Sequence, residues 1–184
     1  PFGFKELEGI HSRTDFDLSQ HEKFSGKKLR YFDPESKETY APYVVETSIG
    51  LDRMFLSVLT ASFQEENLQN DTKRLVLKIP AFLAPFQAAV LPLVKKDGLE
   101  EKSNELYENL RPFLNVTKDE KDAIGRRYRR QDAIGTPVCI TIDHDTLKDD
   151  SVTFRLRDSM EQYRVDLNLV RDELLKLTNF ANFL

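Results

Sequence analysis

The segment ETSIGLDR, residues 46–53, places two carboxylates, two hydroxyl groups, a glycine and an arginine between an apolar strand pattern and an apolar helix pattern. In an extended strand, Glu46 and Ser48 are two residues apart and therefore share one face. Gly50 at the strand-to-helix turn lets a ligand approach the backbone closely. Arg53 falls in the first helical turn, where a cation opposes the helix dipole unless an anion is bound there. The segment offers a carboxylate for an ammonium group and an arginine for a phosphate.

A purely structural interpretation of the same residues stays open. Glu46 and Arg53 could form an ion pair at the boundary between the strand and the helix, with Gly50 acting only as a cap. A single glycine-containing turn is a weak signal for a ligand site. The sequence DHD at residues 143–145 is more typical of a turn than of a metal site, and no metal-binding residue is predicted.

Composition limits the classes of function. The chain has 184 residues, of which 40% are hydrophobic and 32% charged, and its net charge is −4. It is not a polycation, so binding to nucleic acid requires a local basic patch. Cys139 is the single cysteine, which excludes an internal disulfide and a cysteine-based zinc site and favours a reduced, cytoplasmic setting. The most apolar run, residues 81–94, contains two prolines and is too short to span a membrane.

Two domains and a linker are predicted along the chain. Residues 1–65 show short strand patterns, two of them on either side of the turn DPESKE, and a helix from about Gly50 to Phe63. The polar residues 66–74 are the predicted linker. Residues 75–184 are predicted to form a separate α/β domain.

The second domain alternates strand and helix patterns. Strands are predicted in four segments: residues 75–79, 87–94, 137–143 and 151–157. Helices are predicted in three others: residues 99–113, 118–134 and 163–177. The run at 87–94 is apolar almost throughout, as in a central strand covered on both faces. In the first strand, Leu75, Leu77 and Ile79 are expected to face one side. This order predicts a mixed β-sheet with helices packed on it.

A basic segment lies within the second of these helices. Residues 121–132 carry five basic and two acidic side chains, a net charge of +3. Short charge runs are commonly solvated helix faces. The alternative is contact with RNA, because arginine binds phosphate through two hydrogen bonds and tyrosine can stack on a base. The candidate RNA-binding residues of this helix are Arg126, Arg127, Tyr128, Arg129 and Arg130. Arg155 and Arg157 are further candidates, predicted to point outward from a strand. They could equally pair with Asp158 or Glu161.

Four segments resemble glycyl-tRNA synthetases, which are class II aminoacyl-tRNA synthetases. They occur in the order of that family along nearly the whole chain: ELEGIHSRTDFDL (6–18), PYVVETSIGLDR (42–53), YRRQDAIGTP (128–137) and VTFRLRDSMEQ (152–162). ETSIGLDR is similar to the third signature motif of class II synthetases. The resemblance implies the last strands and helix of an antiparallel-sheet catalytic domain over residues 1–65. It implies an anticodon-binding domain, with a mixed β-sheet flanked by helices, over residues 75–184.

The resemblance also implies roles for individual residues. Those implied to contact ATP are Glu6, Leu7, Gly50, Leu51, Asp52 and Arg53. Those implied to surround glycine are Arg13, Glu46, Thr47, Ser48, Ile49 and Gly50. Glu46 is implied to bind the ammonium group of glycine, and Arg53 the phosphates or the adenine of ATP. These two residues are the catalytic candidates.

The activity implied by the resemblance is that of a ligase. Glycine is activated with ATP to glycyl-adenylate and transferred to tRNA(Gly), with Mg²⁺ bound in the full-length enzyme. The implied partners of the whole protein are tRNA(Gly), glycine, ATP and a second copy of itself, with neither DNA nor a membrane. The earlier motifs of the family have no counterpart here, so we expect the C-terminal part of a longer enzyme, inactive alone. Two alternatives stay open: a non-catalytic synthetase-like accessory protein that binds nucleic acid, and an isolated RNA-binding module.

Overall fold

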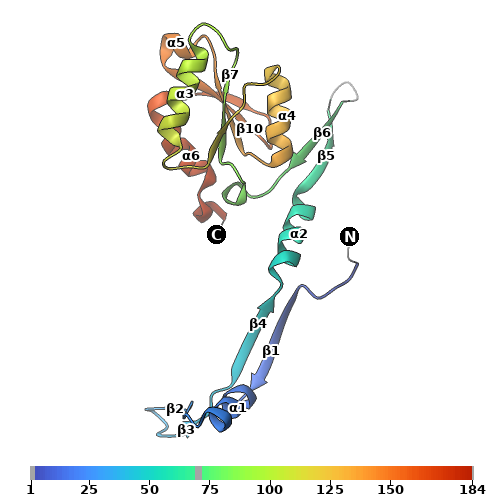
Figure 1. The fold of residues 1–184 in the computed structure, drawn as a ribbon, viewed down its shortest axis with the longest axis vertical. Helices are drawn as coiled ribbons and strands as arrows, with labels where there is room; N and C mark the ends of the chain where they lie inside the picture. Colours follow the sequence, from blue (N-terminus) through green and yellow to red (C-terminus); the bar gives the residue numbers. More distant parts are fainter. Residues whose placement is uncertain (1–2, 69–71, 184) are drawn as a thin grey trace. The chain divides into compact units, whose positions relative to one another are not determined.

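The computed structural model describes residues 3–68 and 72–183, and the chain divides into two compact units, residues 1–57 and 58–184 (Figure 1). Helix α2 (Leu51–Ser62) begins in the first unit and ends in the second. It lies where the helix near Gly50 was predicted. The predicted division into residues 1–65, a linker at 66–74 and residues 75–184 stays a prediction, and residues 69–71 of that linker lie outside the described residues.

The first unit is built on a two-stranded antiparallel sheet. Its strands are β1 (Glu8–Thr14) and β4 (Val44–Ile49). The elements between them in the sequence are α1 (Phe16–Ser25), β2 (Tyr31–Phe32) and β3 (Thr39–Tyr40). The short strands β2 and β3 form a hairpin around the predicted turn. Among the described residues 3–57, only Gly9 is buried. Since two strands cannot enclose a core, side chains in this unit are positioned by strand register and ion pairs.

The second unit contains a five-stranded mixed sheet of order β11-β10-β9-β7-β8. The strands are β7 (Ala88–Pro92), β8 (Val116–Lys118), β9 (Val138–Ile142), β10 (Ser151–Leu156) and β11 (Gln162–Asp166). β7 runs parallel to both of its neighbours, whereas β10 is antiparallel to β9 and β11. The predicted mixed sheet is confirmed. β7 is buried along its whole length, as expected of a strand covered on both faces.

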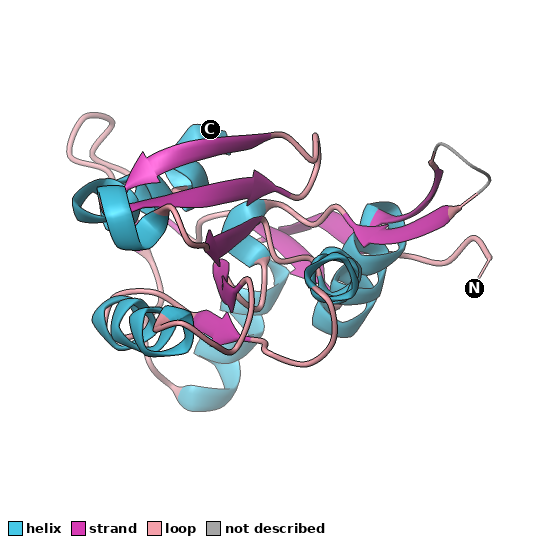
Figure 2. Ribbon diagram, turned by 90° about the horizontal axis from the view of Figure 1, so that it is seen from above, coloured by secondary structure: helices cyan, strands magenta, loops and turns pink. Residues whose placement is uncertain are grey.

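Helices cover both faces of this sheet (Figures 1 and 2). They are α3 (Leu99–Leu110), α4 (Ile124–Ile134), the single turn α5 (Thr146–Asp149) and α6 (Val170–Thr178). Because side chains alternate along a strand, Val90 and Ile140 join the core under α3 and α6, whereas Leu91 and Cys139 pack against α4. The two faces of β7 and β9 therefore belong to two separate apolar clusters.

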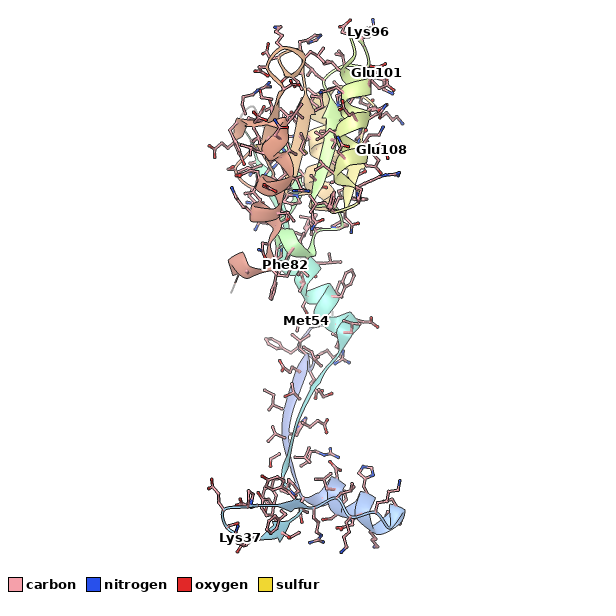
Figure 3. All side chains as sticks on the ribbon, turned by 90° about the vertical axis from the view of Figure 1, so that its left-hand side faces the viewer. Lys37, Met54, Phe82, Lys96, Glu101 and Glu108 are labelled. Atoms are coloured by element: carbon pink, nitrogen blue, oxygen red, sulfur yellow. The ribbon has the colours of Figure 1, made fainter. Side chains whose placement is uncertain are left out.

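Helix α3 has one apolar and one polar side. On α3, Leu99 and Leu106 are buried in the core, while Glu101 and Glu108 are exposed (Figure 3).

Within residues 3–68 and 72–183, no helix has the length and apolar character needed to cross a membrane.

The first predicted strand lies in the hairpin of β5 (Phe63–Asn67) and β6 (Lys73–Leu77), where a charged residue is on the buried side. Arg74 and Val76 are fully buried, while Leu75 is exposed. The reason is that Arg74 donates a hydrogen bond to the carbonyl oxygen of Arg157 at 2.9 Å and reaches the carboxylate of Asp132. Ion pairing thus accommodates the charged Arg74 on the buried side of β6, beside Val76.

Three predicted helix boundaries are also wrong. Residues 118–123 are not helical, because β8 pairs with β7 and because Asp122 has a φ of 72°, which ends a right-handed helical path. Phe113 lies beyond the end of α3 and is exposed. Tyr163 belongs to β11 and faces Phe154 of β10, so the last helix begins only at Val170.

Candidate functional site

Glu46 and Ser48 lie on one face of the β1–β4 sheet, as their spacing predicted. The register pairs Glu46 with His11 and Ser48 with Gly9, so His11 belongs to the same face. A Cβ atom on Gly9 would lie 2.5 Å from Nε2 of His11, and glycine at this position leaves room for the imidazole. His11 was not among the predicted site residues, because only the pairing of two strands places it opposite Glu46.

Arg13 lies beside Glu46 at a β-bulge. The register of the β1–β4 sheet shifts between Ser12 and Thr14, which leaves Arg13 as an extra residue, and Thr14 has a φ of 53°. Nε of Arg13 lies 3.5 Å from Oε2 of Glu46. The structure thus places two residues of the predicted glycine set next to each other.

Arg13 makes its hydrogen bonds with a residue outside the predicted set. Its Nε donates to Oδ2 of Asp17 at 2.8 Å, and its Nη2 donates to Oδ1 at 3.0 Å. The hydrogen bond from Arg13 holds the pKa of Asp17 below its ordinary value. The same bond, with a smaller contribution from Glu46, raises the pKa of Arg13. One cation is therefore shared by two carboxylates, which leaves an excess of negative charge beside Glu46.

Arg53 does not pair with Glu46, so the ion-pair interpretation of these two residues is wrong. Its Nη1 donates to the carbonyl oxygen of Glu6 at 2.5 Å. The amide of Gly50 donates to the carbonyl oxygen of Leu7 at 3.4 Å. These two contacts bring together the chain before β1 and the turn into α2. The first turn of α2 also carries amide groups that have no partner within the helix.

The other predicted residues of this region are placed by the same elements. Thr47 and Ile49 alternate with Ser48 along β4 and so face the opposite side of the sheet. Leu51 and Asp52 open α2, and both are exposed. The described geometry therefore groups Arg13, Glu46 and Ser48 on one face and Thr47 and Ile49 on the other.

Two arginines of α4 form hydrogen bonds with other parts of the second unit. Arg127 is buried and donates to two carbonyl oxygens at the end of β7, from Nη1 to Pro92 at 2.5 Å and from Nη2 to Leu93 at 3.0 Å. Burial lowers the pKa of Arg127. Arg130 donates from Nε to the carboxylate of Asp119 at 2.8 Å. These arginines stabilise the loops around the sheet.

Arg155 and Arg157 are buried, which corrects their predicted outward orientation. Arg155 makes two hydrogen bonds with the buried carboxylate of Asp132, at 2.8 and 3.0 Å. Its guanidinium carbon lies 4.7 Å from the ring centre of Tyr128. Arg157 pairs with Asp158 at 2.8 Å, one of the two partners considered from the sequence. Both arginines are therefore paired, Arg155 with a buried carboxylate and Arg157 with an exposed one.

Arg126 and Arg129 are exposed arginines of α4 with only long ion pairs, whereas Arg130, 41% exposed, pairs with Asp119 and Asp122 at 2.8 Å. Their side chains are 78% and 44% exposed, and the nearest carboxylate oxygens are 3.7 and 3.9 Å away. Three residues apart, they lie on the same side of the helix. Tyr128 is half-buried, with its hydroxyl 2.6 Å from that of Thr141. Both a solvated face and an RNA contact remain open for Arg126 and Arg129.

The described residues offer little for metal or thiol chemistry. Residues 3–68 and 72–183 contain no group of three or more His, Cys, Asp or Glu side chains arranged to hold a metal ion. Burial in β9 raises the pKa of Cys139 to about 12. At neutral pH this thiol is protonated and is a poor nucleophile.

The sequence of this chain matches one family model and several curated proteins. A family model described as an anticodon binding domain matches residues 87–177. The glycine–tRNA ligase of Clostridium tetani is 53% identical over 176 residues, which are 96% of this chain and 37% of that protein. The glycine–tRNA ligase of Chlorobaculum tepidum is 51% identical over 91% of this chain and 36% of its own length. The chain thus spans little more than a third of the length of these curated relatives.

A solved structure shares the fold. It is the RNA binding domain of threonyl-tRNA synthetase from Cryptosporidium parvum, with a TM-score of 0.61 and 20% sequence identity. The match covers 81% of this chain and 35% of the other. At this identity the likeness concerns the fold alone.

Proposed function

We propose that this chain, a homologue of glycine–tRNA ligases with an anticodon-binding domain at residues 87–177, supplies part of the glycine-activating site and the tRNA-binding domain of such a ligase. The observation that carries the proposal is the identity of about half of all residues with these ligases along nearly the whole chain. We expect the full-length enzyme to be a homodimer, as the resemblance implies.

In this proposal the face with Glu46 and Ser48 binds glycine. Glu46 accepts the ammonium group, Ser48 provides a hydroxyl on the same face, and Arg13 borders the pocket beside Glu46. Glycine has no side chain, so a close-fitting site can reject larger amino acids by steric exclusion. This avoids the weak discrimination that results when an enzyme must sense a missing methylene group.

The region around Arg53 binds ATP in this proposal. Arg53 and the amide groups in the first turn of α2 suit an anionic nucleotide. A carboxylate oxygen of glycine attacks the α-phosphorus, the bond to the bridging oxygen breaks, and pyrophosphate leaves. A ribose hydroxyl of the terminal adenosine of the tRNA then attacks the carbonyl carbon, and AMP leaves. Arg53 stabilises negative charge as it develops. Mg²⁺ accompanies the triphosphate, and we assign no described residue as its ligand.

The second unit binds the anticodon arm of tRNA(Gly) in this proposal. Arg126 and Arg129 are the contacts we retain from α4, because their side chains are exposed and their ion pairs are long, at 3.7 and 3.9 Å, whereas Arg130 is held by two carboxylates at 2.8 Å. Arg127, Arg155 and Arg157 are not retained, because their guanidinium groups are buried and bonded internally. Anticodon bases are single-stranded and can be splayed out for recognition at their edges.

The test is amino-acid-dependent exchange of pyrophosphate into ATP by the full-length enzyme that contains this sequence. Glycine is expected to support exchange, and alanine and serine are not. The Glu46→Ala variant is expected to lose glycine-dependent exchange while keeping its affinity for tRNA(Gly). Efficient exchange with alanine or serine, or undiminished exchange by the Glu46→Ala variant, would contradict the proposal.

A further inference from the structure

We propose that Asp17 is a positioning residue of the glycine site, which holds the N–H groups of Arg13 away from Glu46 and so keeps the oxygens of Glu46 available for an ammonium group. The inference rests on the proposed function, because it uses the roles proposed for Arg13 and Glu46. It adds a residue that lies in α1, outside both strands of the site.

The geometry shows an unequal division of Arg13 between two carboxylates. Arg13 gives two hydrogen bonds, at 2.8 and 3.0 Å, to Asp17. The closest approach to Glu46 is 3.5 Å, and among the described residues no hydrogen bond joins these two side chains. The edge of the guanidinium formed by Nε and Nη2 is therefore occupied by Asp17. A carboxylate can accept such an edge through two parallel hydrogen bonds, and Glu46 lies within reach to do so.

Two local features set this arrangement. Arg13 lies at the bulge of β1, on the face of His11 and Glu46, and the first turn of α1 presents Asp17 four residues later. A carboxylate in the first turn of a helix is favoured by the helix dipole. The side chains of Arg13, Asp17 and Glu46 are 42%, 29% and 42% exposed. A small ligand can therefore reach Glu46 without displacing the pair formed by Arg13 and Asp17.

Loss of the Asp17 carboxylate frees Arg13 to bind Glu46. An ammonium group would then have to compete with a guanidinium that already occupies the oxygens of Glu46. In the full-length ligase we expect Asp17→Asn to raise the KM for glycine by about tenfold. The reason is that the net free energy of a hydrogen bond between charged groups corresponds to about a tenfold change in a binding constant. The KM for ATP is expected to stay unchanged, and kcat at saturating glycine is expected to change little.

Three variants separate positioning from a structural role. Asp17→Glu keeps a carboxylate and is expected to restore most of the affinity for glycine. Glu22→Gln breaks another arginine–carboxylate pair of α1, with Arg30 at 3.1 Å, and is expected to leave the KM for glycine unchanged. In an Arg13→Gln background, Asp17→Asn is expected to cause no further rise in KM, because Asp17 acts through Arg13.

The outcomes are distinguishable. An unaltered full-length enzyme that does not activate glycine would refute the proposed function, and this inference with it. An enzyme that activates glycine, but whose KM for glycine is unaffected by Asp17→Asn, would overturn the inference alone. So would a rise in KM that persists in the Arg13→Gln background. If Asp17→Asn does not fold, Asp17→Ser also removes the carboxylate and provides the same comparison.

Discussion

Asp132 and Arg155 form a buried ion pair in the second unit, with Nη1 to Oδ1 at 2.8 Å and Nη2 to Oδ2 at 3.0 Å. Arg74 of β6 approaches the same carboxylate at 3.4 Å and pairs with Glu66 of β5 at 2.6 Å. A single carboxylate of α4 thus connects strand β10 with the β5–β6 hairpin. Removing it leaves two buried cations with less counter-charge.

The first prediction concerns this carboxylate. Asp132→Ala is expected to lower the free energy of unfolding of the 184-residue chain by about 3–5 kcal/mol, because breaking one side of a buried pair leaves an uncompensated charge. Urea denaturation measures the change. The matched control is Asp145→Ala, which removes an exposed carboxylate paired with Lys148. The control is expected to change the transition little, and equal effects of the two variants would contradict the assignment.

The second prediction concerns Ser103 in α3. Its hydroxyl is buried and has no hydrogen-bond partner among the described residues. Ser103→Ala is expected to raise the free energy of unfolding by about 1 kcal/mol, because it removes an unsatisfied polar group. Thr178→Val is the comparison, since the Thr178 hydroxyl is buried but donates to the carbonyl oxygen of Leu174 at 2.8 Å. Thr178→Val is expected to destabilise the chain. A stabilising effect of Thr178→Val would count against the interpretation that hydrogen bonding of the buried hydroxyl distinguishes the two sites.

The third prediction concerns Cys139. Burial raises the pKa of its thiol to about 12. A thiol-specific reagent at pH 8 is therefore expected to label the chain only when the second unit unfolds. Labelling followed across a urea titration should rise together with the unfolding transition. Rapid labelling of the native chain would show that β9 is more open than the structure indicates.

The fourth prediction concerns the pH dependence of stability through Asp143. Burial alone would raise the pKa of Asp143, but hydrogen bonds from Arg164 and from the amide of Thr146 hold it below its ordinary value. A lowered folded-state pKa means that the carboxylate stabilises the fold fully above the unfolded-state pKa, which is about 3.9. This contribution is lost as the pH falls through the folded-state pKa.

The Asp143→Asn variant tests this linkage. Its deficit in unfolding free energy relative to the unaltered chain is expected to be full at neutral pH and to shrink as the solution becomes acidic. Urea denaturation at a series of pH values measures the difference. A deficit that stays constant through the acid range would mean that the charge of Asp143 is not what stabilises the turn.

The fifth prediction separates two kinds of arginine on α4. Arg126→Gln and Arg129→Gln are each expected to weaken binding to tRNA(Gly) and to reduce the slope of log affinity against log salt by about one, with stability unchanged. Arg127→Gln is expected to lower stability instead, because it removes hydrogen bonds to Pro92 and Leu93. Unchanged salt slopes for the first two variants would identify the exposed arginines as a merely solvated face.

Local periodicity in the sequence was a good guide where burial follows from neighbouring residues. The apolar run that forms β7 predicted a strand covered on both faces, and the stripe of Leu99, Ser103, Leu106 and Leu110 predicted α3. The spacing of Glu46 and Ser48 predicted that they share a face. Each of these depends only on the repeat of a strand or a helix.

The failures arose where distant residues decide the outcome. Arg155 faces inward because Asp132, 23 positions earlier, provides its counter-charge, and Arg74 is buried for the same reason. Alternation alone treats such arginines as solvent-facing. The bulge at Arg13 is a property of the pairing of two strands and has no mark in one strand pattern. The same pairing of β1 with β4 places His11 opposite Glu46 in the candidate site.

The most direct test of the central claim is a titration of the 184-residue chain against tRNA(Gly) and against a copy with altered anticodon bases. The salt concentration must be the same in both, because phosphate contacts dominate affinity and depend on salt. If the second unit recognises the anticodon of a glycine tRNA, the unaltered tRNA binds more tightly. Equal affinity for the two RNAs would contradict the claim that this chain carries the anticodon-reading part of a glycine–tRNA ligase.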